Sequence, residues 1–267
     1  MEKNVLLVLG NGYNRENLID SAVYLRDNFG FAIRPLHVRD VRKKEFLPNA
    51  VDGIMLEPMI AGINEEWNRY EEHEIENIKQ QLTEKGVDAE LEVKFGITPE
   101  IVIEELKKSD ILLIEKEEKF SEDLIVILKR FFKPIIVVRD KVLKLDKVAI
   151  SNDDGTKVNK SFQRFINIFT HVTEITSLEV RDPQKHDEEE DEEEVHENYL
   201  NAYMRGKGIN VISKQFPKGE SQDFLDICKE EDVLIMGNLS NSYIFEKITK
   251  KLGVKIMEDV ETTLFIA

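Results

Sequence analysis

Short apolar runs alternate with longer amphipathic stretches along the first half of the chain. Each run is four to seven residues long and consists mostly of Val, Ile and Leu, which is typical of strands covered by helices on both faces. The amphipathic stretches carry apolar residues at helical spacing. Strand followed by helix, several times over, predicts a parallel α/β sheet with right-handed crossovers. The predicted strands are Asn4–Leu9, Ala32–Val38, Glu90–Phe95, Ile111–Ile114 and Ile135–Val138, and the predicted helices are Arg15–Asn28, Asn64–Lys85, Pro99–Lys107 and Ser121–Phe132.

The same order of elements recurs in the second half, so the sequence contains an internal repeat. Two of the matching strings lie 142 and 122 residues apart, which leaves twenty extra residues between the second and third strands of the first repeat. These extra residues map to roughly Arg42–Ile63, where Pro and Gly residues indicate an excursion or loop. The matching strings are Asn4–Val8 with Asp146–Ile150, Pro35–Asp40 with Ser177–Asp182, and Lys107–Ile114 with Lys229–Met236.

We therefore predict two tandem five-stranded parallel α/β repeats, at residues 1–140 and 146–267, with a short join between them. The final strands, Ile135–Val138 and Leu264–Ala267, are 129 residues apart, so the first repeat is seven residues shorter just before its end.

The amino-acid composition excludes several classes of protein. The chain has 267 residues, with 53 acidic against 37 basic ones and a net charge of −16, which argues against binding to nucleic acid or to an anionic membrane. A single cysteine, Cys228, excludes an intramolecular disulfide framework, and we expect a buried, inert thiol. No apolar stretch approaches the roughly 18 residues of a membrane span, and the apolar start is too short for a signal peptide, so a cytoplasmic location is expected.

Half of the net charge lies in one run of eight acidic residues, Asp187–Glu194, flanked by His186 and His196. We predict a mobile acidic loop or a frayed helix start there, because runs of like charge are usually solvated or disordered. A docking surface for a basic partner and a metal site are the alternatives. The equivalent place in the first repeat is a glutamate-rich helix, and we expect its acidic residues to lie on one exposed surface: Glu65, Glu66, Glu71, Glu72, Glu74 and Glu76.

The duplicated unit resembles the universal stress protein family in its tandem form, over nearly the whole chain. Asp232–Gly237 is similar to the family's aspartate, apolar strand and glycine before the phosphate loop. Lys147–Asp153 resembles the family's first strand, which ends in an aspartate, and Gly96–Glu100 resembles the Gly-x-Pro opening of its third helix. The resemblance implies a Rossmann-like fold in which the two repeats form a pseudo-dimer through their final strands.

Many members of that family bind ATP at the carboxyl ends of the strands, so the resemblance also implies a site. In the first repeat, Gly10 replaces the family's aspartate and Glu115 replaces the first glycine of its phosphate loop, so ATP is not expected there. In the second repeat the aspartate and first glycine are present, but Ser240 replaces the second glycine and two lysines replace a Gly-Ser pair. The candidate nucleotide-binding residues are Asp153, Val180, Gly237, Asn238, Ser240, Lys250 and Lys251.

Gly10-Asn11-Gly12 follows a strand and precedes a helix, which invites comparison with a dinucleotide-binding loop. The third glycine of that motif is absent, since Arg15 stands in its place. A strand-to-helix turn that needs a positive φ is the simpler interpretation.

No arrangement of nucleophile, base and orienting group is visible, so the sequence predicts neither catalytic residues nor a metal site. We expect a cytoplasmic stress-response protein with a regulatory or protective role, without robust catalysis and without a bound cofactor. Two alternatives stay open: an ATP-binding, slowly hydrolysing switch that uses the second repeat, and an interaction scaffold that presents the acidic segment. A second copy of the chain and an unknown protein are the expected partners.

Overall fold

The computed structural model describes residues 3–10, 15–45, 57–116, 121–181, 198–217, 221–237 and 260–267. In the first half, the predicted strands and helices are found within a few residues of their expected positions, apart from one longer helix. The strands of this half are β1 (Lys3–Val8), β2 (Phe31–Asp40), β3 (Glu92–Gly96), β4 (Ile111–Glu115) and β5 (Ile135–Val138). Its helices are α1 (Arg15–Phe29), α2 (Arg42–Glu45), α3 (Glu57–Glu84), α4 (Thr98–Leu106) and α5 (Glu122–Arg130).

The second half repeats this order of strand and helix. Its strands are β6 (Val148–Asn152), β7 (Glu174–Arg181), β8 (Asn210–Pro217), β9 (Val233–Met236) and β10 (Thr263–Ile266). Its helices are α6 (Thr156–Ile168), α7 (Tyr199–Gly206) and α8 (Ser221–Glu230). The acidic run Asp187–Glu194 lies outside the described residues, so its predicted loop stays a prediction.

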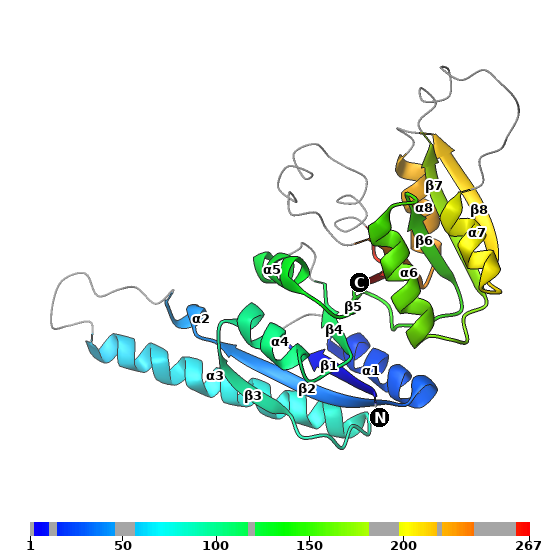
Figure 1. Ribbon diagram of the computed structural model, residues 1–267. Coiled ribbons are helices and arrows are strands. Elements are labelled where there is room, and N and C mark those ends of the chain that lie inside the picture. The colour runs from blue at the N-terminus through cyan, green and yellow to red at the C-terminus, as the bar shows by residue number, and fades with distance from the viewer. Residues whose placement is uncertain are drawn as a thin grey trace, which may run out of the picture.

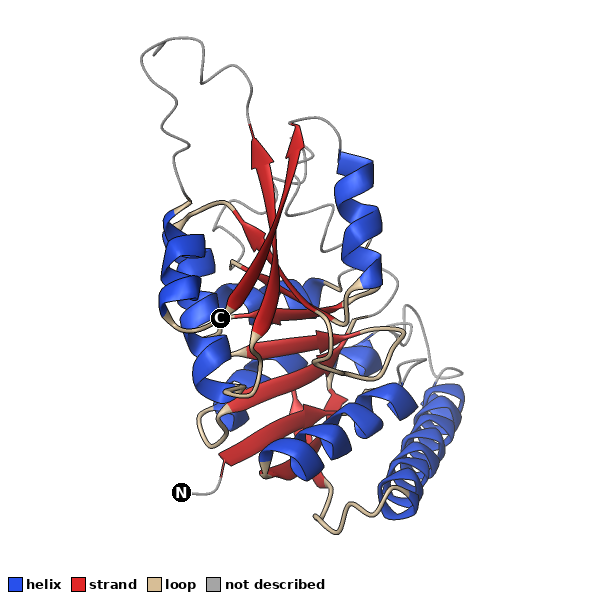
Figure 2. Cartoon of the chain, turned by 90° about the vertical axis from the view of Figure 1, so that its right-hand side faces the viewer, coloured by secondary structure: helices blue, strands red, loops and turns tan. Residues whose placement is uncertain are grey.

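All ten strands belong to one sheet, in the order β3-β2-β1-β4-β5-β10-β9-β6-β7-β8 (Figure 1). Neighbouring strands are parallel except at the centre, where β5 and β10 are antiparallel and pair Ile136 with Phe265. This contact joins the two halves through their final strands, and it confirms the predicted pseudo-dimer of α/β units. The strands turn strongly from one half to the other (Figure 2), as the twist of a wide sheet requires.

Alternate strand residues face two separate apolar cores. Leu7 of β1 belongs to the core that also contains residues of α1, α3, α6 and α7, whereas its neighbour Leu6 belongs to the core that contains residues of α4, α5 and α8. Because both faces are covered, β5 and β9 are apolar and buried at every position. The α5 helix begins where the sequence predicts, since the Ser121 Oγ atom accepts a hydrogen bond from the Leu124 backbone N–H.

An aspartate before each central strand fixes how the two halves correspond. The Asp110 carboxylate accepts a hydrogen bond from the Asn4 N–H at 2.7 Å, and the Asp232 carboxylate accepts one from the Lys147 N–H at 3.0 Å. Asn4 therefore corresponds to Lys147, which is an offset of 143 residues in the sequence. The predicted match of Asn4 with Asp146 is wrong by one residue, because two apolar strings can slide past each other without losing their pattern.

The twenty extra residues of the first half lie mainly in a helix. The strand registers confirm offsets of 142 residues between β2 and β7 and 122 residues between β3 and β8. Between these strands, α3 has 28 residues and its counterpart α7 has 8. The loop predicted for Arg42–Ile63 is wrong at both ends, because α2 begins at Arg42 and α3 begins at Glu57. Pro58 lies in the first turn of α3, where its missing N–H is tolerated.

Candidate functional site

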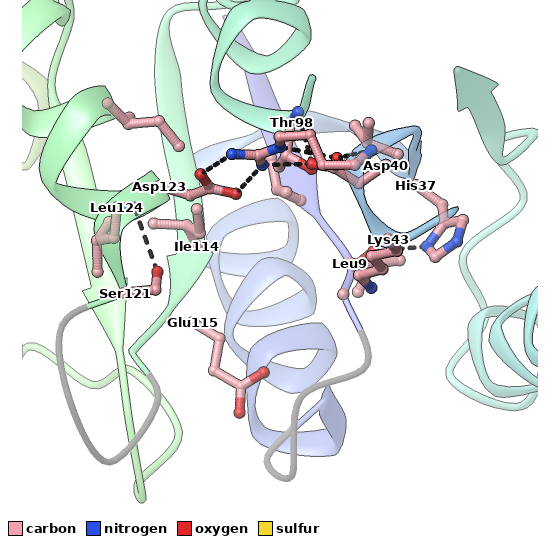
Figure 3. A pocket seen from close by; sticks show the side chains of 15 residues that line it. Leu9, His37, Asp40, Lys43, Thr98, Ile114, Glu115, Ser121, Asp123 and Leu124 are labelled. Carbon is pink, nitrogen blue, oxygen red and sulfur yellow. Dashed lines mark hydrogen bonds and ion pairs between the residues drawn. The ribbon is translucent and has the colours of Figure 1, made fainter. Parts of the chain in front are cut away.

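A cavity of about 350 Å³ opens at the carboxyl-terminal edge of the first-half sheet, where ligands settle in open α/β folds. Its walls come from the ends of β1, β2 and β4, from α2, and from the starts of α4 and α5 (Figure 3). Val8, Val38 and Ile114 give it an apolar lining. Its charged groups are on Asp40, Arg42, Lys43, Glu115 and Asp123.

The Arg42 guanidinium bridges two carboxylates at this cavity. Its Nη2 atom lies 2.5 Å from Asp40 Oδ2 and 2.6 Å from Asp123 Oδ2, and its Nη1 atom lies 2.9 Å from Asp123 Oδ1. Thr98, at the start of α4, donates to Asp40 through its backbone N–H at 3.0 Å and its hydroxyl at 2.6 Å. The bridge therefore ties β2, α2, α4 and α5 together, and we call it the Arg42 bridge.

These contacts shift the pKa values of Asp40 and Arg42 in the Arg42 bridge. Hydrogen bonds from Arg42 hold the pKa of the Asp40 carboxyl well below its usual range, although burial opposes the shift and Thr98 adds to it. The same contacts with Asp40 and Asp123 raise the pKa of Arg42. Most hydrogen-bond donors of the guanidinium are already used by the two carboxylates.

Glu115 adds a third carboxylate to the cavity, at the carboxyl end of β4 (Figure 3). The register equates Ile111 of β4 with Val233 of β9, so Glu115 corresponds to Gly237 of the second half. Three carboxylates and two basic side chains leave the lining with an excess of negative charge. A bound triphosphate would meet a like charge where the family resemblance places the first loop glycine.

His37, for which the sequence predicts no role in a site, lines the same cavity. His37 is buried, and its Nδ1 atom lies 2.8 Å from the Leu9 carbonyl oxygen. Its Nε2 atom lies 3.6 Å from Glu71 Oε2, and Arg39 Nε lies 3.5 Å from the same carboxylate oxygen. Nothing in the spacing of the sequence signals this cluster, because its members come from β1, β2 and the remote helix α3.

The buried position of Glu71 corrects one expectation. The acidic residues of α3 do not form one exposed surface, since Glu71 and Glu74 face the sheet while Glu65, Glu66, Glu72 and Glu76 are exposed. Glu74 forms an ion pair with Arg15 of α1. A helix places residues three positions apart on the same face, so two glutamates lie on the inner side of an otherwise acidic outer surface.

In the second half, three of the candidate nucleotide-binding residues lie within the described part of the chain. Asp153 is exposed just after β6, and its Oδ1 atom accepts a hydrogen bond from the N–H of Gly155, the residue that caps α6. Gly237 packs against the first turn of α6, and Val180 is an exposed residue of β7. Asn238, Ser240, Lys250 and Lys251 lie outside the described residues.

Close packing against α6 explains why a glycine stands at position 237, with no need to invoke a bound ligand. A Cβ atom at this position would lie 3.0 Å from the Cβ of Lys157 and 3.2 Å from the backbone N of Val158. The glycine of the first half behaves differently, because Gly10 has open space around it and its φ is not positive; the positive φ predicted for the Gly10-Asn11-Gly12 turn stays a prediction. Gly12 lies outside the described residues.

A network of hydrogen-bonded polar side chains, centred on a glutamate, occupies the second-half position that matches His37. The 142-residue offset equates His37 with Glu179, which is buried. Its Oε1 atom accepts hydrogen bonds from Asn201 Nδ2 at 2.6 Å and Ser213 Oγ at 2.8 Å. Asn152 extends the network by donating to Ser177 and Asn201. The two halves thus hold different polar clusters between the second strand and the helix that follows it.

Among the described residues there is neither a metal-binding cluster nor a membrane-spanning helix. No three His, Cys, Asp or Glu side chains gather there as a metal site. No helix among those residues has the length and apolar character needed to cross a bilayer.

Comparison of the fold with solved structures identifies its relatives. A universal stress protein from Archaeoglobus fulgidus superposes with a TM-score of 0.65 at 13% identity, covering 99% of this chain and 95% of its own. A functionally unknown protein from Pseudomonas aeruginosa superposes with a TM-score of 0.58 at 9% identity, covering 99% of this chain and 92% of its own. At the level of sequence, no family model and no curated protein matches. The chain therefore has the fold of a universal stress protein along almost its entire length, as the resemblance of its motifs predicted.

Proposed function

We propose that this protein is a stress-response factor with a regulatory or protective role, that it acts without catalysis, and that its first half does not bind nucleotide. The observation that carries the proposal is the Arg42 bridge, which places charged carboxylates at the edge where the fold would otherwise receive phosphate. Such a cavity favours no anion, because the positive charge of Arg42 is already neutralised by Asp40 and Asp123.

The size of the effect supports this proposal. Two like charges 4 Å apart interact unfavourably by about 4 kcal/mol at an effective dielectric constant near 20. One such contact between Glu115 and a phosphate would weaken binding by roughly three orders of magnitude, since about 1.4 kcal/mol corresponds to a factor of ten. Turning Arg42 toward the phosphate would not help, because two buried or half-buried carboxylates would lose their partner.

Nucleotide content and calorimetry test the proposal. The purified protein is denatured, and any released nucleotide is identified by absorbance and mass; ATP is then titrated into the intact protein. We expect no nucleotide from the first half. ATP binding that disappears in Lys43→Glu, an exposed position of the cavity, and survives in the exposed control Lys144→Glu would overturn the proposal.

A second candidate is a nucleotide-binding switch in the second half, and the start of α6 favours it. This helix begins at Gly155 without a side-chain cap and has no acidic residue in its first turn, whereas α5 has a serine cap and two acidic residues there. Free N–H groups at a helix start attract anions. Asp153 and Gly237 flank this turn, as the family resemblance implies for the second half.

The same titration distinguishes the two candidates. If the second half binds ATP, Lys157→Glu should weaken binding at least tenfold, because it adds a negative charge to the exposed first turn of α6. Lys144→Glu should leave the affinity unchanged. Asp153→Ala provides an independent variant, and a thermal melt controls for loss of its hydrogen bond with the Gly155 N–H. Absence of binding in the wild-type protein would exclude this second candidate.

A further inference from the structure

A second cavity, of about 390 Å³, opens at the amino-terminal edge of the first-half sheet, opposite the Arg42 bridge. Lys3 and Phe31 stand at the starts of β1 and β2, and Lys133 directly precedes β5. The last turns of α6, including Arg164, form the other wall, so this cavity lies between the two halves of the chain. We call it the basic groove.

The basic groove has an unusual charge for so acidic a protein. Three cationic side chains line it, from Lys3, Lys133 and Arg164, against one carboxylate, from Asp110. Within the described part of the chain, none of the three cations forms an ion pair with a carboxylate. Asp110 already accepts a hydrogen bond from the Asn4 N–H at 2.7 Å, so its charge is held at the end of the strand.

The cations are oriented by carbonyl groups and by rings. Lys133 Nζ donates to the carbonyl oxygens of Lys107 at 2.9 Å and Ser109 at 2.5 Å, and Arg164 Nη1 donates to that of Phe132 at 3.4 Å. Carbonyl oxygens hold these groups in place without cancelling a full charge. An ammonium has three N–H donors and a guanidinium has five, so both side chains keep donors for a ligand.

The walls of the basic groove are apolar. Phe31 is only 1% exposed and Pro134 is buried, whereas the Phe132 side chain is 43% exposed. The ammonium groups of Lys3 and Lys133 lie 5.7 Å from the ring centres of Phe31 and Phe132, respectively. Positive charge is thus placed beside a hydrophobic surface, which suits a ligand that carries an anionic group on an apolar body.

Internal symmetry provides a comparison, because the second half lacks these cations. An offset of 143 residues equates Lys3 with Asp146, and the offset of 129 residues between β5 and β10 equates Lys133 with Thr262. An acid and a buried threonine therefore replace two lysines at the matching edge. The positive charge is a property of this one groove and not a consequence of the fold.

We propose that the basic groove binds a small amphipathic anion, with a carboxylate, phosphate or sulfonate group on an aromatic or aliphatic body. The anionic group would lie among Lys3, Lys133 and Arg164, and the body would cover Phe132 and Ile168. The volume is within the range of roughly 300–1,000 Å³ that is usual for small-molecule sites. This site is separate from the nucleotide edge, so it does not depend on the function proposed above.

A fluorescent aromatic sulfonate, 8-anilinonaphthalene-1-sulfonate, is the probe. Its binding is measured by fluorescence and by calorimetry, on the wild-type protein and on Lys3→Glu/Arg164→Glu. Lys160→Glu is the matched control, because Lys160 is exposed on the same helix α6 and does not line the groove. Octanoate and octylammonium then serve as competitors that share an aliphatic body and differ in the sign of the charge.

We expect saturable binding of one probe per chain, weakened at least tenfold by the double substitution and unchanged by the control. Octanoate should displace the probe, octylammonium should not, and added salt should weaken binding because the groove is open to solvent. If the double variant does not fold, Lys3→Gln provides the same comparison, since Lys3 contacts only the Phe31 ring among the described groups. Absence of saturable binding, equal loss in the control, or displacement by octylammonium alone would overturn the proposal.

Discussion

His37 Nε2 and Glu71 Oε2 lie 3.6 Å apart in the buried contact between β2 and α3. Neither atom has a hydrogen-bond partner among the described residues. The Nδ1 atom of the same imidazole faces the Leu9 carbonyl oxygen, which can only accept, so Nδ1 carries a hydrogen. The two remaining polar atoms therefore depend on each other and on the nearby Arg39 guanidinium.

We expect Glu71→Ala to lower the free energy of unfolding by about 2–3 kcal/mol, because it removes the acidic group that faces the buried Nε2 atom of His37 and the Nε atom of Arg39. Glu71→Gln keeps the shape and offers an amide N–H to Nε2, so it should cost less than about 1 kcal/mol. Urea denaturation measures both values. Equal losses for the two variants would contradict a polar contact here.

Glu105 predicts how stability depends on pH. Burial opposes its charged form, but ion pairs with Lys108, Arg34 and Lys94 lower the pKa of Glu105 to about 2. A carboxyl with a lowered pKa stabilises the fold above its ordinary pKa of about 4.3, and this contribution is lost as the pH falls toward 2. Glu105→Gln should therefore be less stable than wild type by up to about 3 kcal/mol at pH 7. The difference should shrink steadily below pH 5 in urea titrations, and a gap that stays constant to pH 2.5 would argue against this origin.

The Arg42 bridge should give a measurable coupling free energy between Arg42 and Asp123 in unfolding experiments. In a double-mutant cycle with Arg42→Ala and Asp123→Ala, we expect about 0.5–2 kcal/mol of coupling, limited because the Arg42 side chain is 38% exposed. Lys43→Ala is the control, since Lys43 lines the same cavity and is not one of the residues that form the Arg42 bridge. Coupling of the same size between Lys43 and Asp123 would mean that general charge, and not the bridge, accounts for the effect.

Two glycines at the strand ends should respond in opposite ways. Gly237→Ala should destabilise the protein by about 1–3 kcal/mol, because the new methyl group meets the first turn of α6. Gly10→Ala should be neutral or slightly stabilising, since open space surrounds Gly10 and its φ is ordinary. Thermal melts of the pair test this directly. Equal tolerance at both positions would remove the packing explanation for Gly237.

Cys228 should report on unfolding. Its side chain is fully buried in the core beneath α8, and burial raises the pKa of the thiol to about 12, with a further contribution from Glu231. We expect no labelling by iodoacetamide in the native protein and complete labelling in denaturant, measured by mass. Labelling at the same rate in both conditions would contradict the buried position.

The sequence alone was sufficient for most of the fold, because its strands are apolar, short and regularly separated by amphipathic helices. Ile135–Val138 was predicted with its observed bounds. The residue-by-residue correspondence between β1 of the first repeat and β6 of the second could not be predicted in this way. Strings of Val, Leu and Ile look alike when they are shifted by one residue. The backbone hydrogen bonds of Asn4 and Lys147 settle it.

The first-half cavity could be predicted only in part. Gly10 and Glu115 marked it as unsuited to nucleotide by comparison with a family pattern, yet the Arg42 bridge joins residues 81 positions apart and leaves no local pattern. Glu71 and Glu74 likewise belong to an acidic string, and only the rotation of α3 decides which glutamates face inward. Composition describes a surface well, but contacts between distant segments follow from the packing.

Because β5 and β10 are antiparallel, the two repeats have opposite strand directions in the sheet, which the repeated sequence alone does not reveal. Because the two halves of the sheet run opposite ways, the carboxyl ends of the second-half strands lie along the same rim as the amino ends of the first-half strands. The basic groove and the Asp153–Gly237 corner therefore share one rim, while the Arg42 bridge is on the other. Two repeats of one kind of unit therefore form a molecule whose two rims differ in charge and in chemistry.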